Sequence, residues 1–250
     1  MKTKGNTILI TGGATGIGFS LAETLVNAGN KVIICGRREH KLKEAKSKLP
    51  QLQIKVCDVS KAKEREELCN WARDNVKDLN VLLNNAGIQR MIDFKKGPQE
   101  LLAGESEIET NLVALIHLCA YFIPLLQKKE EAAIFNVASG LAFIPLASTP
   151  IYCATKAAIH SFNQSLRYQL RDTSIKVFEI VPPRADTEIG KGTTDEKYQA
   201  YRGIPPSEVA SATLAGMEKD EFQIIVDGAE RLVMGSRTDP EGVFLQVNQR

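Results

Sequence analysis

Two side chains, Tyr152 and Lys156, have the types and the spacing needed to exchange a proton. If they share a helix, residues i and i+4 lie on the same face. A phenol has a pKa of about 10, but an ammonium group about 4 Å away favours the phenolate by roughly 4 kcal/mol at an effective dielectric of about 20, or about three pKa units. Desolvation of the phenolate opposes part of this effect. The pair predicts an acid/base group that titrates near neutral pH, although a Tyr-x-x-x-Lys pattern taken alone is more often an ordinary surface pair.

A glycine-rich segment, Thr11-Gly12-Gly13-Ala14-Thr15-Gly16-Ile17-Gly18, follows the first apolar run. Glycines permit a tight turn, let the backbone approach a pyrophosphate closely and leave room for a helix to pack on a strand. The helix N-terminus adds unpaired N–H groups and a partial positive charge. Glycine-rich turns also join strands to helices without binding anything, but the strand before this segment and the helix after it favour a phosphate-binding loop.

Short apolar, β-branched runs alternate with longer segments of helical period. They predict strands at Thr7–Ile10, Lys31–Cys35, Gln53–Cys57, Val81–Leu83, Ala133–Val137, Lys176–Val181 and Phe222–Val226. The spacing of apolar residues predicts an amphipathic helix over Ile17–Ala28, with Gly29 as its C-cap. Continuous apolar strands separated by helices indicate a parallel sheet covered on both faces. We expect an α/β protein, a doubly wound Rossmann fold with seven parallel strands, forming one domain over residues 1–250.

The loop spacing Gly-x-x-x-Gly-x-Gly resembles that of the short-chain dehydrogenase/reductase family. Further matches in order and spacing are Asn84-Asn85-Ala86-Gly87 after the fourth run, Ser139 after the fifth, Tyr152-x-x-x-Lys156, Asn111 and the segment from Pro182 to Thr187. The resemblance extends from about residue 5 to about residue 228. Within the family, the glycine loop, the Gly36-Arg37-Arg38 turn and Pro182-Pro183 are most similar to a bacterial subgroup labelled DltE-like.

The resemblance implies a catalytic role for four residues. Tyr152 is expected to be the general acid/base, and Lys156 is expected to assist it and to bind the nicotinamide ribose. Ser139 is expected to hydrogen-bond the substrate carbonyl or alcohol. Asn111 matches the asparagine that kinks its helix and holds a water in the proton relay, although an asparagine beside an apolar run is usually a cap.

The resemblance also implies a larger set of cofactor contacts. These are Gly12, Thr15, Gly16, Ile17, Gly18, Arg37, Arg38, Asp58, Val59, Asn85, Ala86, Gly87, Tyr152, Lys156, Pro182 and Thr187. Of these, Asn85 is better suited to tying neighbouring strands together than to touching the reacting atoms, and Thr187 matches the contact to the nicotinamide carboxamide. Asp58 resembles the adenine contact, but a lone aspartate before a helix is equally suited to be an N-cap.

Two arginines indicate the preferred cofactor. An acidic residue at the end of the second strand of a Rossmann unit binds the adenosine ribose and would repel a 2′-phosphate. Here that position is Gly36, followed by Arg37 and Arg38, whose planar guanidinium groups bind phosphate. We therefore expect NADP(H) to be preferred and NAD(H) to remain possible, against the alternative that the two arginines form an ordinary solvated face.

The chain departs from the family at Pro183, where glycine is usual, so the path of the following segment is open. Residues 183–206 are polar and follow a strand end, which predicts a mobile flap over the substrate site. Leu141-Ala142-Phe143-Ile144-Pro145-Leu146 follows Ser139 and would border the reacting carbon with apolar side chains. A partly hydrophobic carbonyl or alcohol substrate is therefore expected.

Composition excludes several classes of partner. The 32 basic and 30 acidic residues give a net charge of +2, too small for the broad basic field that binds nucleic acid. The apolar stretch Leu112–Leu126 is shorter than the roughly 20 residues of a membrane span, which indicates a buried or partner-packed helix. Five scattered cysteines without metal spacing indicate reduced thiols in the cytoplasm and no metal site.

Three functions compete at this stage. The first is an NADPH-dependent carbonyl reductase, or its reverse, that forms a homodimer or homotetramer through the helices containing Leu112–Leu126 and Ala154–Leu170. The second is a catalytically silent dinucleotide sensor, which would usually have lost the tyrosine or the lysine. The third is a membrane-associated scaffold, which the length of the apolar helix disfavours.

Overall fold

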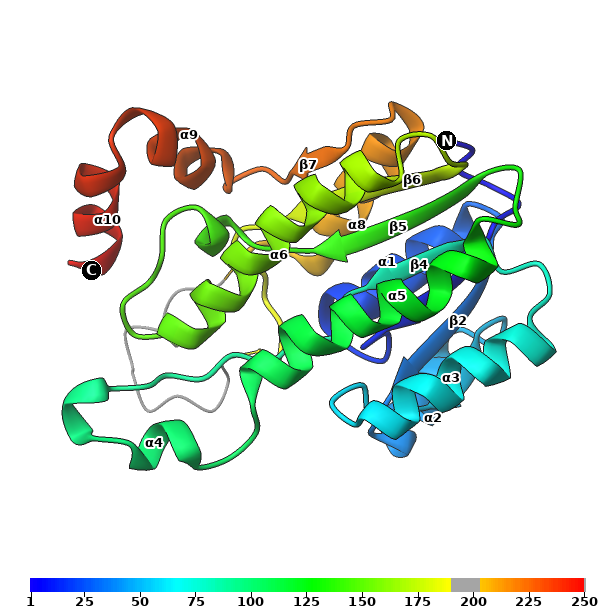
Figure 1. The fold of residues 1–250 in the computed structure, drawn as a ribbon, viewed down its shortest axis with the longest axis horizontal. Helices are drawn as coiled ribbons and strands as arrows, with labels where there is room; N and C mark the ends of the chain where they lie inside the picture. The colour runs from blue at the N-terminus through cyan, green and yellow to red at the C-terminus, as the bar shows by residue number, and fades with distance from the viewer. Residues whose placement is uncertain (190–202, 250) are drawn as a thin grey trace.

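The apolar, β-branched runs form one seven-stranded sheet in the computed structural model, which describes residues 1–189 and 203–249 (Figure 1). All strand pairings are parallel, and the order is β3-β2-β1-β4-β5-β6-β7. The strands are β1 (Thr7–Thr11), β2 (Lys31–Gly36), β3 (Gln53–Val56), β4 (Val81–Asn84), β5 (Ala132–Val137), β6 (Ile175–Val181) and β7 (Gln223–Ile225). The predicted doubly wound fold is confirmed, and each predicted strand end lies within one residue of the observed end.

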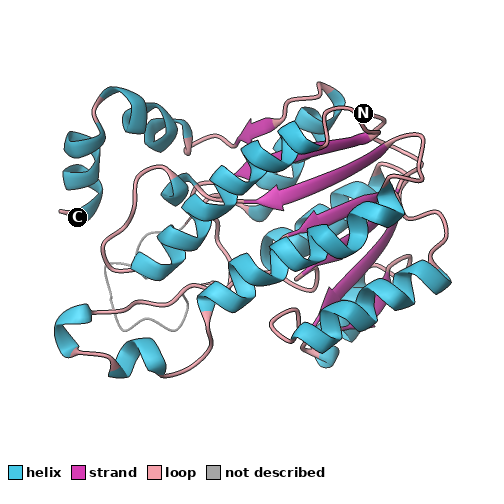
Figure 2. Ribbon diagram, in the orientation of Figure 1, coloured by secondary structure: helices cyan, strands magenta, loops and turns pink. Residues whose placement is uncertain are grey.

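Helices connect the strands and cover both faces of the sheet (Figure 2). The α-helices are α1 (Gly16–Asn27), α2 (Glu39–Lys48), α3 (Ala62–Asn75), α4 (Gln99–Leu102), α5 (Ala114–Leu126), α6 (Pro150–Gln169), α8 (Pro206–Glu218), α9 (Glu230–Thr238) and α10 (Pro240–Asn248). A π-helix, η2 (Ile108–Val113), precedes α5, and two short 3-10 turns are η1 (Phe94–Lys96) and η3 (Gly140–Ala142). Helices α1, α2 and α8 pack on one face, and α3, α5 and α6 pack on the other.

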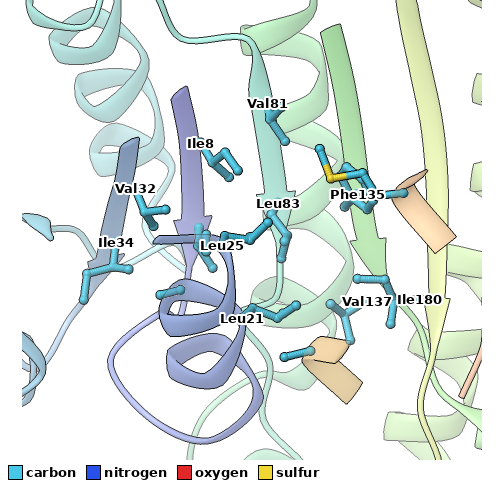
Figure 3. Packing of buried hydrophobic residues seen from close by; sticks show 14 of the residues in the cluster. Ile8, Leu21, Leu25, Val32, Ile34, Val81, Leu83, Phe135, Val137 and Ile180 are labelled. Atoms are coloured by element: carbon cyan, nitrogen blue, oxygen red, sulfur yellow. The ribbon is translucent and has the colours of Figure 1, made fainter. Parts of the chain in front are cut away.

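The core follows the two-residue period of the strands, because successive side chains point to opposite faces. Ile8 and Ile10 of β1 pack with α1, whereas Leu9 between them packs on the face covered by α5. Figure 3 shows Leu21 and Leu25 of α1 seated over the central strands. Each buried side chain of this size stabilises the fold by roughly 1.5–3 kcal/mol. Burial on both faces explains why the central strands lack the polar alternation that the partly exposed edge strand β3 shows.

Helix α1 ends at the predicted glycine. Gly29 has a φ of +90°, a conformation that costs little only for a residue without a Cβ. Its N–H donates to the carbonyl of Val26 at 2.9 Å, and the N–H of Asn30 donates to that of Leu25 at 3.1 Å, which is the pattern of a Schellman cap. The sharp stop turns the chain directly into β2.

One helical stretch in the described residues, Ile108–Leu126, is long and apolar enough by length and composition to cross a membrane. It has 19 residues and a mean hydropathy of 1.6, because η2 continues into α5. Core helices pass the same test, and here Leu118, Phe122 and Leu126 are fully buried against α3 and the sheet. The contacts are those of a core helix.

Truncation of α5 side chains tests this assignment. Leu118 is 1% exposed, so Leu118→Ala should lower the free energy of unfolding by about 2–5 kcal/mol through lost burial and a residual cavity. Leu125, half-buried on the same helix, is the matched control and should cost less. Urea denaturation midpoints measure both, and equal midpoints for the two variants would contradict the packing described.

Candidate active site

The sequence-predicted residues lie at the carboxyl ends of the central strands. The strand order reverses between β1 and β4, which is where doubly wound proteins bind ligands. The glycine loop leaves β1 at this point, and the Asn85–Gly87 segment leaves β4 beside it. Ser139 follows β5, and Tyr152 lies in the first turn of α6.

The glycine loop is packed too tightly for side chains. Gly12 has a φ of +65°, and a Cβ there would lie 2.9 Å from the Cα of Ala86. A Cβ on Gly18 would lie 2.3 Å from the carbonyl oxygen of Gly12. Gly16, with a φ of +55°, adjoins the methyl group of Thr187. The loop leads into the N-terminus of α1, where Thr15 is the N-cap residue and Ile17 lies in the first turn.

Asn85 joins the two loops. Its backbone N–H donates to Thr11 Oγ1 at 3.0 Å, and its Nδ2 donates to the carbonyls of Thr11 and Gly12 at 3.0 and 3.1 Å. The N–H of Ala86 donates to the same Thr11 Oγ1 at 3.1 Å. These bonds agree with the prediction that Asn85 ties neighbouring strands together, and they fix Ala86 against the glycine loop.

Arg37 and Arg38 extend from the end of β2 with their guanidinium groups half-exposed. Arg38 Nη2 lies 3.5 Å from Thr15 Oγ1 in the glycine loop and 2.9 Å from Glu188 Oε2. Arg37 Nη1 lies 2.7 Å from Glu105 Oε2, and this hydrogen bond raises the pKa of Arg37. The structure thus places Arg38 next to the glycine loop, and it gives each arginine an acidic partner that the sequence did not indicate.

Asp58 forms a turn and does not cap the next helix. Its Oδ1 accepts from the N–H of Ser60 at 3.0 Å and from the Ser60 hydroxyl at 2.8 Å, whereas the N-cap of α3 is Lys61. The N-cap alternative is therefore wrong. Val59 is buried, and its carbonyl accepts from the buried Arg65 at 2.7 Å.

Lys156 is buried beside Tyr152. The residue is 4% exposed. Its Nζ donates to the carbonyl of Val137 at 2.7 Å and lies 5.5 Å from the centre of the Tyr152 ring. Burial lowers the pKa of Lys156 to about 8. The ammonium group points to the end of β5, where the carbonyl of Val137 accepts its hydrogen bond. At pH 7 the group is still mainly a cation.

Asn111 lies within the π-helix η2, where the wider turn interrupts the regular helix. Its Oδ1 accepts from the N–H of Ile88 at 2.8 Å, and its Nδ2 donates to the carbonyl of Ile88 at 2.9 Å and to Thr155 Oγ1 at 3.2 Å. A Cβ on Gly87 would lie 3.5 Å from Asn111 Oδ1 and 3.8 Å from Lys156 Nζ. The structure thus brings Gly87, Asn111 and Lys156 together.

Ser139 is 7% exposed, and its Oγ accepts from the N–H of Leu141 at 3.1 Å. The carbonyl of Pro182 accepts from the N–H of Gly140 at 2.9 Å, which joins the ends of β5 and β6. The two ends of the predicted flap meet in a bridge between Ala185 and Ile204. Of the flap, residues 190–202 lie outside the described residues.

No sequence motif indicated the contacts made by the C-terminal helices. Leu232 of α9 packs on Gly140, where a Cβ would lie 2.9 Å from Leu232 Cδ1. Asn248 of α10 accepts from the N–H of Ala147 at 2.6 Å and donates to the carbonyl of Pro145 at 3.1 Å. Figure 1 shows α10 on the side of the molecule toward which β5 points. The loop after Ser139 is therefore held at both ends, by contacts too distant in sequence for a motif to reveal.

Other candidate chemistry is absent from the part of the chain that the structure describes. It contains no group of three or more His, Cys, Asp or Glu side chains that could hold a metal. All five cysteines are buried and unpaired there. Burial raises the pKa of Cys153, beside the proposed acid, so it is a poor nucleophile.

Together, the reversed strand order, the close-packed glycine loop at the N-terminus of α1 and the buried Lys156 beside a half-buried Tyr152 are typical of a nucleotide-binding α/β enzyme. A family model described as short chain dehydrogenase matches residues 6–198, and the chain therefore belongs to this family of oxidoreductases. The predicted resemblance is confirmed.

Relatives extend this match to the whole chain. A Bacillus subtilis (strain 168) protein named uncharacterized oxidoreductase DltE is 50% identical over 248 residues, which cover 99% of this chain and 98% of that protein. The predicted similarity to the DltE-like subgroup is thus confirmed. A Staphylococcus aureus (strain MRSA252) protein named uncharacterized oxidoreductase SAR2567 is 31% identical, covering 82% of this chain and 88% of that protein.

Solved structures share the fold. A short chain dehydrogenase from Burkholderia cenocepacia J2315 in complex with NADP has a TM-score of 0.84 and 24% identity, covering 99% of each chain. A short chain dehydrogenase/reductase from Burkholderia phymatum in complex with NAD also has a TM-score of 0.84, with 21% identity, covering 100% of this chain and 98% of that one. A serine dehydrogenase complexed with NADP+ has a TM-score of 0.74 and 27% identity, covering 84% of this chain and 88% of that one.

The lowered pKa of Lys156 predicts a pH-dependent stability. Because burial lowers the folded-state pKa from 10.5 to about 8, the unfolded chain holds this proton more tightly, and its contribution to the free energy of unfolding rises between about pH 8 and pH 10.5. Below pH 8 the buried charge costs about 3 kcal/mol, so Lys156→Met should stabilise the fold there. The gain should fade toward pH 10.5.

Urea denaturation across this pH range measures the difference. Lys63→Met is the control, since the Lys63 side chain is 87% exposed. A difference between wild type and Lys156→Met that does not change with pH would contradict the assignment.

Proposed function

We propose that the protein is an NADPH-dependent oxidoreductase that interconverts a carbonyl compound and its alcohol, with Tyr152 as the general acid/base. The observation that carries the proposal is the buried Lys156 ammonium, 5.5 Å from the centre of the Tyr152 ring and beside the loop after β4. Among the described residues no carboxylate pairs with Lys156, and a buried unpaired charge is costly to maintain. Its position beside a phenol at the ligand-binding edge of the sheet favours a catalytic use.

The residues present fit a nicotinamide dinucleotide. The cradle at Gly12 and Gly18, which a Cβ would fill, and the N-terminus of α1 suit a pyrophosphate. Gly87 and Thr187 would lie along the nicotinamide end, where Lys156 would bind the ribose. When bound, the cofactor supplies or accepts the hydride. Proton transfer and the positioning of the substrate would depend on side chains of this protein.

Proton transfer would proceed through Tyr152. In the reducing direction the phenol O–H donates its proton to the developing alkoxide, and the Lys156 cation stabilises the phenolate that remains. Ser139 Oγ would hold the substrate oxygen, for which its hydroxyl can donate while it continues to accept from Leu141. Asn111 Oδ1 has a second lone pair beyond the one used by Ile88, which suits it to hold a water that returns the proton.

The basic pair supports NADP(H) over NAD(H). Arg38 lies at the glycine loop and Arg37 beside it, and no acidic side chain takes the place of Gly36. The Burkholderia cenocepacia structure is bound to NADP and the Burkholderia phymatum structure to NAD, so the fold accommodates both. The preference must therefore come from local charge, which here favours a 2′-phosphate.

The loop after Ser139 supports a partly hydrophobic substrate. Leu141, Phe143 and Leu146 are each half-buried, so part of each apolar side chain is accessible, whereas Ile144 is 2% exposed and belongs to the core.

We also infer a homodimer or homotetramer formed through α5 and α6, one domain over the whole chain, and a cytoplasmic location in keeping with the five unpaired cysteines.

Tyr152→Phe tests the acid/base assignment. The variant keeps the ring but loses the proton, so turnover should fall by roughly 10²–10⁴-fold while the Kd for NADPH is unchanged. NADPH consumption over a panel of carbonyl compounds, with fluorescence titration of the cofactor, measures both. Tyr168→Phe, at a 68% exposed tyrosine on the same helix, is the matched control. Retained turnover in Tyr152→Phe would refute the role, and cofactor binding without turnover of any panel member by wild type would indicate a sensor.

Arg37→Asp tests the cofactor preference. Loss of a charge-assisted bond worth about 1.5–3 kcal/mol should weaken NADPH binding by roughly 10–150-fold. NADH has no 2′-phosphate, so its Kd should change much less. Equal binding of NADH and NADPH by wild type, or an unaltered NADPH affinity in the variant, would contradict the preference.

A further inference from the structure

The two arginines of the cofactor site are each held by a carboxylate from a different, distant part of the chain. Arg38 pairs with Glu188, which follows β6, and Arg37 pairs with Glu105, which precedes η2. Neither glutamate belongs to the glycine loop or to the catalytic group. Two consecutive residues thus receive one acidic partner each, from the segments that follow β4 and β6.

Glu188 is positioned by the end of β6. It follows Thr187, whose methyl group adjoins Gly16, so the segment lies directly on the glycine loop. The Glu188 Oε2 to Arg38 Nη2 distance is 2.9 Å, and the same Nη2 is 3.5 Å from Thr15 Oγ1. The carboxylate therefore takes a guanidinium N–H at the loop that would receive the cofactor phosphates.

Glu105 is positioned by the loop after β4. The guanidinium of Arg90 donates from Nη1 to the carbonyls of Glu105 at 3.1 Å and Leu101 at 3.5 Å, and its Nη2 donates to the carbonyl of Glu100. This anchor holds the segment while the Glu105 carboxylate reaches Arg37 at 2.7 Å. The Arg37–Glu105 pair thus links the end of β2 to the segment before Asn111.

Both pairs are weak enough to exchange. The four side chains are between 44% and 51% exposed, and such ion pairs contribute only about 0.2–1 kcal/mol. A phosphate monoester carries about two negative charges and three acceptor oxygens, so it is a stronger partner for the same donors. A guanidinium N–H that points at a carboxylate is not available to a phosphate until the carboxylate moves.

We infer that Glu105 and Glu188 determine how strongly the site discriminates between NADPH and NADH, because each carboxylate competes with the 2′-phosphate for an arginine. Each carboxylate takes an N–H donor of its arginine, so the 2′-phosphate competes with it for that donor, whereas a cofactor without the phosphate leaves both pairs intact. The inference rests on the proposed NADPH-dependent function.

The test measures binding without turnover. Glu105→Gln and Glu188→Gln keep side-chain size and remove the competing charge, and calorimetric titration compares adenosine 2′,5′-bisphosphate with 5′-AMP and NADPH with NADH. Each variant should bind the 2′-phosphate ligands about two- to five-fold more tightly, with little change for 5′-AMP and NADH. Glu39→Gln is the matched control, since Glu39 follows Arg38 in sequence but pairs with Lys43 at 2.7 Å.

A double-mutant cycle identifies the mechanism. In an Arg38→Gln background, Glu188→Gln should give no further gain in affinity, because the N–H donor for which Glu188 and the phosphate compete is gone.

Weaker or unchanged binding of adenosine 2′,5′-bisphosphate in both glutamate variants would overturn the inference, as would an equal gain for 5′-AMP. If wild type fails to prefer NADPH, the proposed cofactor is wrong, yet tighter adenosine 2′,5′-bisphosphate binding by the variants would still support the competition. A wild type that prefers NADPH, with unresponsive variants, would refute the competition alone.

Discussion

The burial of one positive charge is the constraint on which the catalytic half of the structure depends. Lys156 is inside the protein, and its ammonium is held by a backbone carbonyl at the end of β5. Helix α6 must therefore lie close against the sheet, and Tyr152 one turn earlier is carried to the same edge. Desolvation that lowers the pKa of Lys156 also strengthens its field on the nearby phenol, because less water screens it. Burial of Lys156 thus lowers the free energy of unfolding at the position where the proposed proton transfer uses its charge.

Binding geometry depends on a second constraint, the close approach of two backbones. The glycine loop and the loop after β4 touch at Gly12 and Ala86, and Asn85 and Thr11 supply the hydrogen bonds that hold them. Side chains are excluded at Gly12 and Gly18, so under the proposed function recognition would come from backbone N–H groups and from the residues at the rim. Arg37 and Arg38 are the rim residues on the β2 side, and their acidic partners make that rim electrically balanced before a ligand arrives.

Local patterns predicted the fold closely, whereas long-range partners escaped them. The strands were predictable because runs such as Lys31–Cys35 are apolar and β-branched, and Gly29 marked the end of α1 through its backbone freedom. The order of the family motifs predicted a site at Ser139, Tyr152 and Lys156, and the structure places these residues after β5 and on α6. In contrast, Glu105 and Glu188 lie far along the chain from the arginines they contact, and Asn248 lies about a hundred residues from the loop it holds. Neither composition nor spacing encodes such pairs. Asp58 shows a different failure, because an aspartate before a helix was compatible with an N-cap but forms a turn with Ser60.

The division of the sheet about β1 and β4 has a consequence for the growing polypeptide. Strands β1 to β4, the glycine loop and Asn85 are all encoded before residue 88, whereas Ser139, Tyr152 and Lys156 come later. A chain that emerges N-terminus first can assemble its nucleotide-binding half while β4 still lacks its neighbour β5. During that interval β4 is an unpaired edge, and both of its faces are apolar. Until β5 is synthesised and pairs with β4, this edge can associate with other polypeptides.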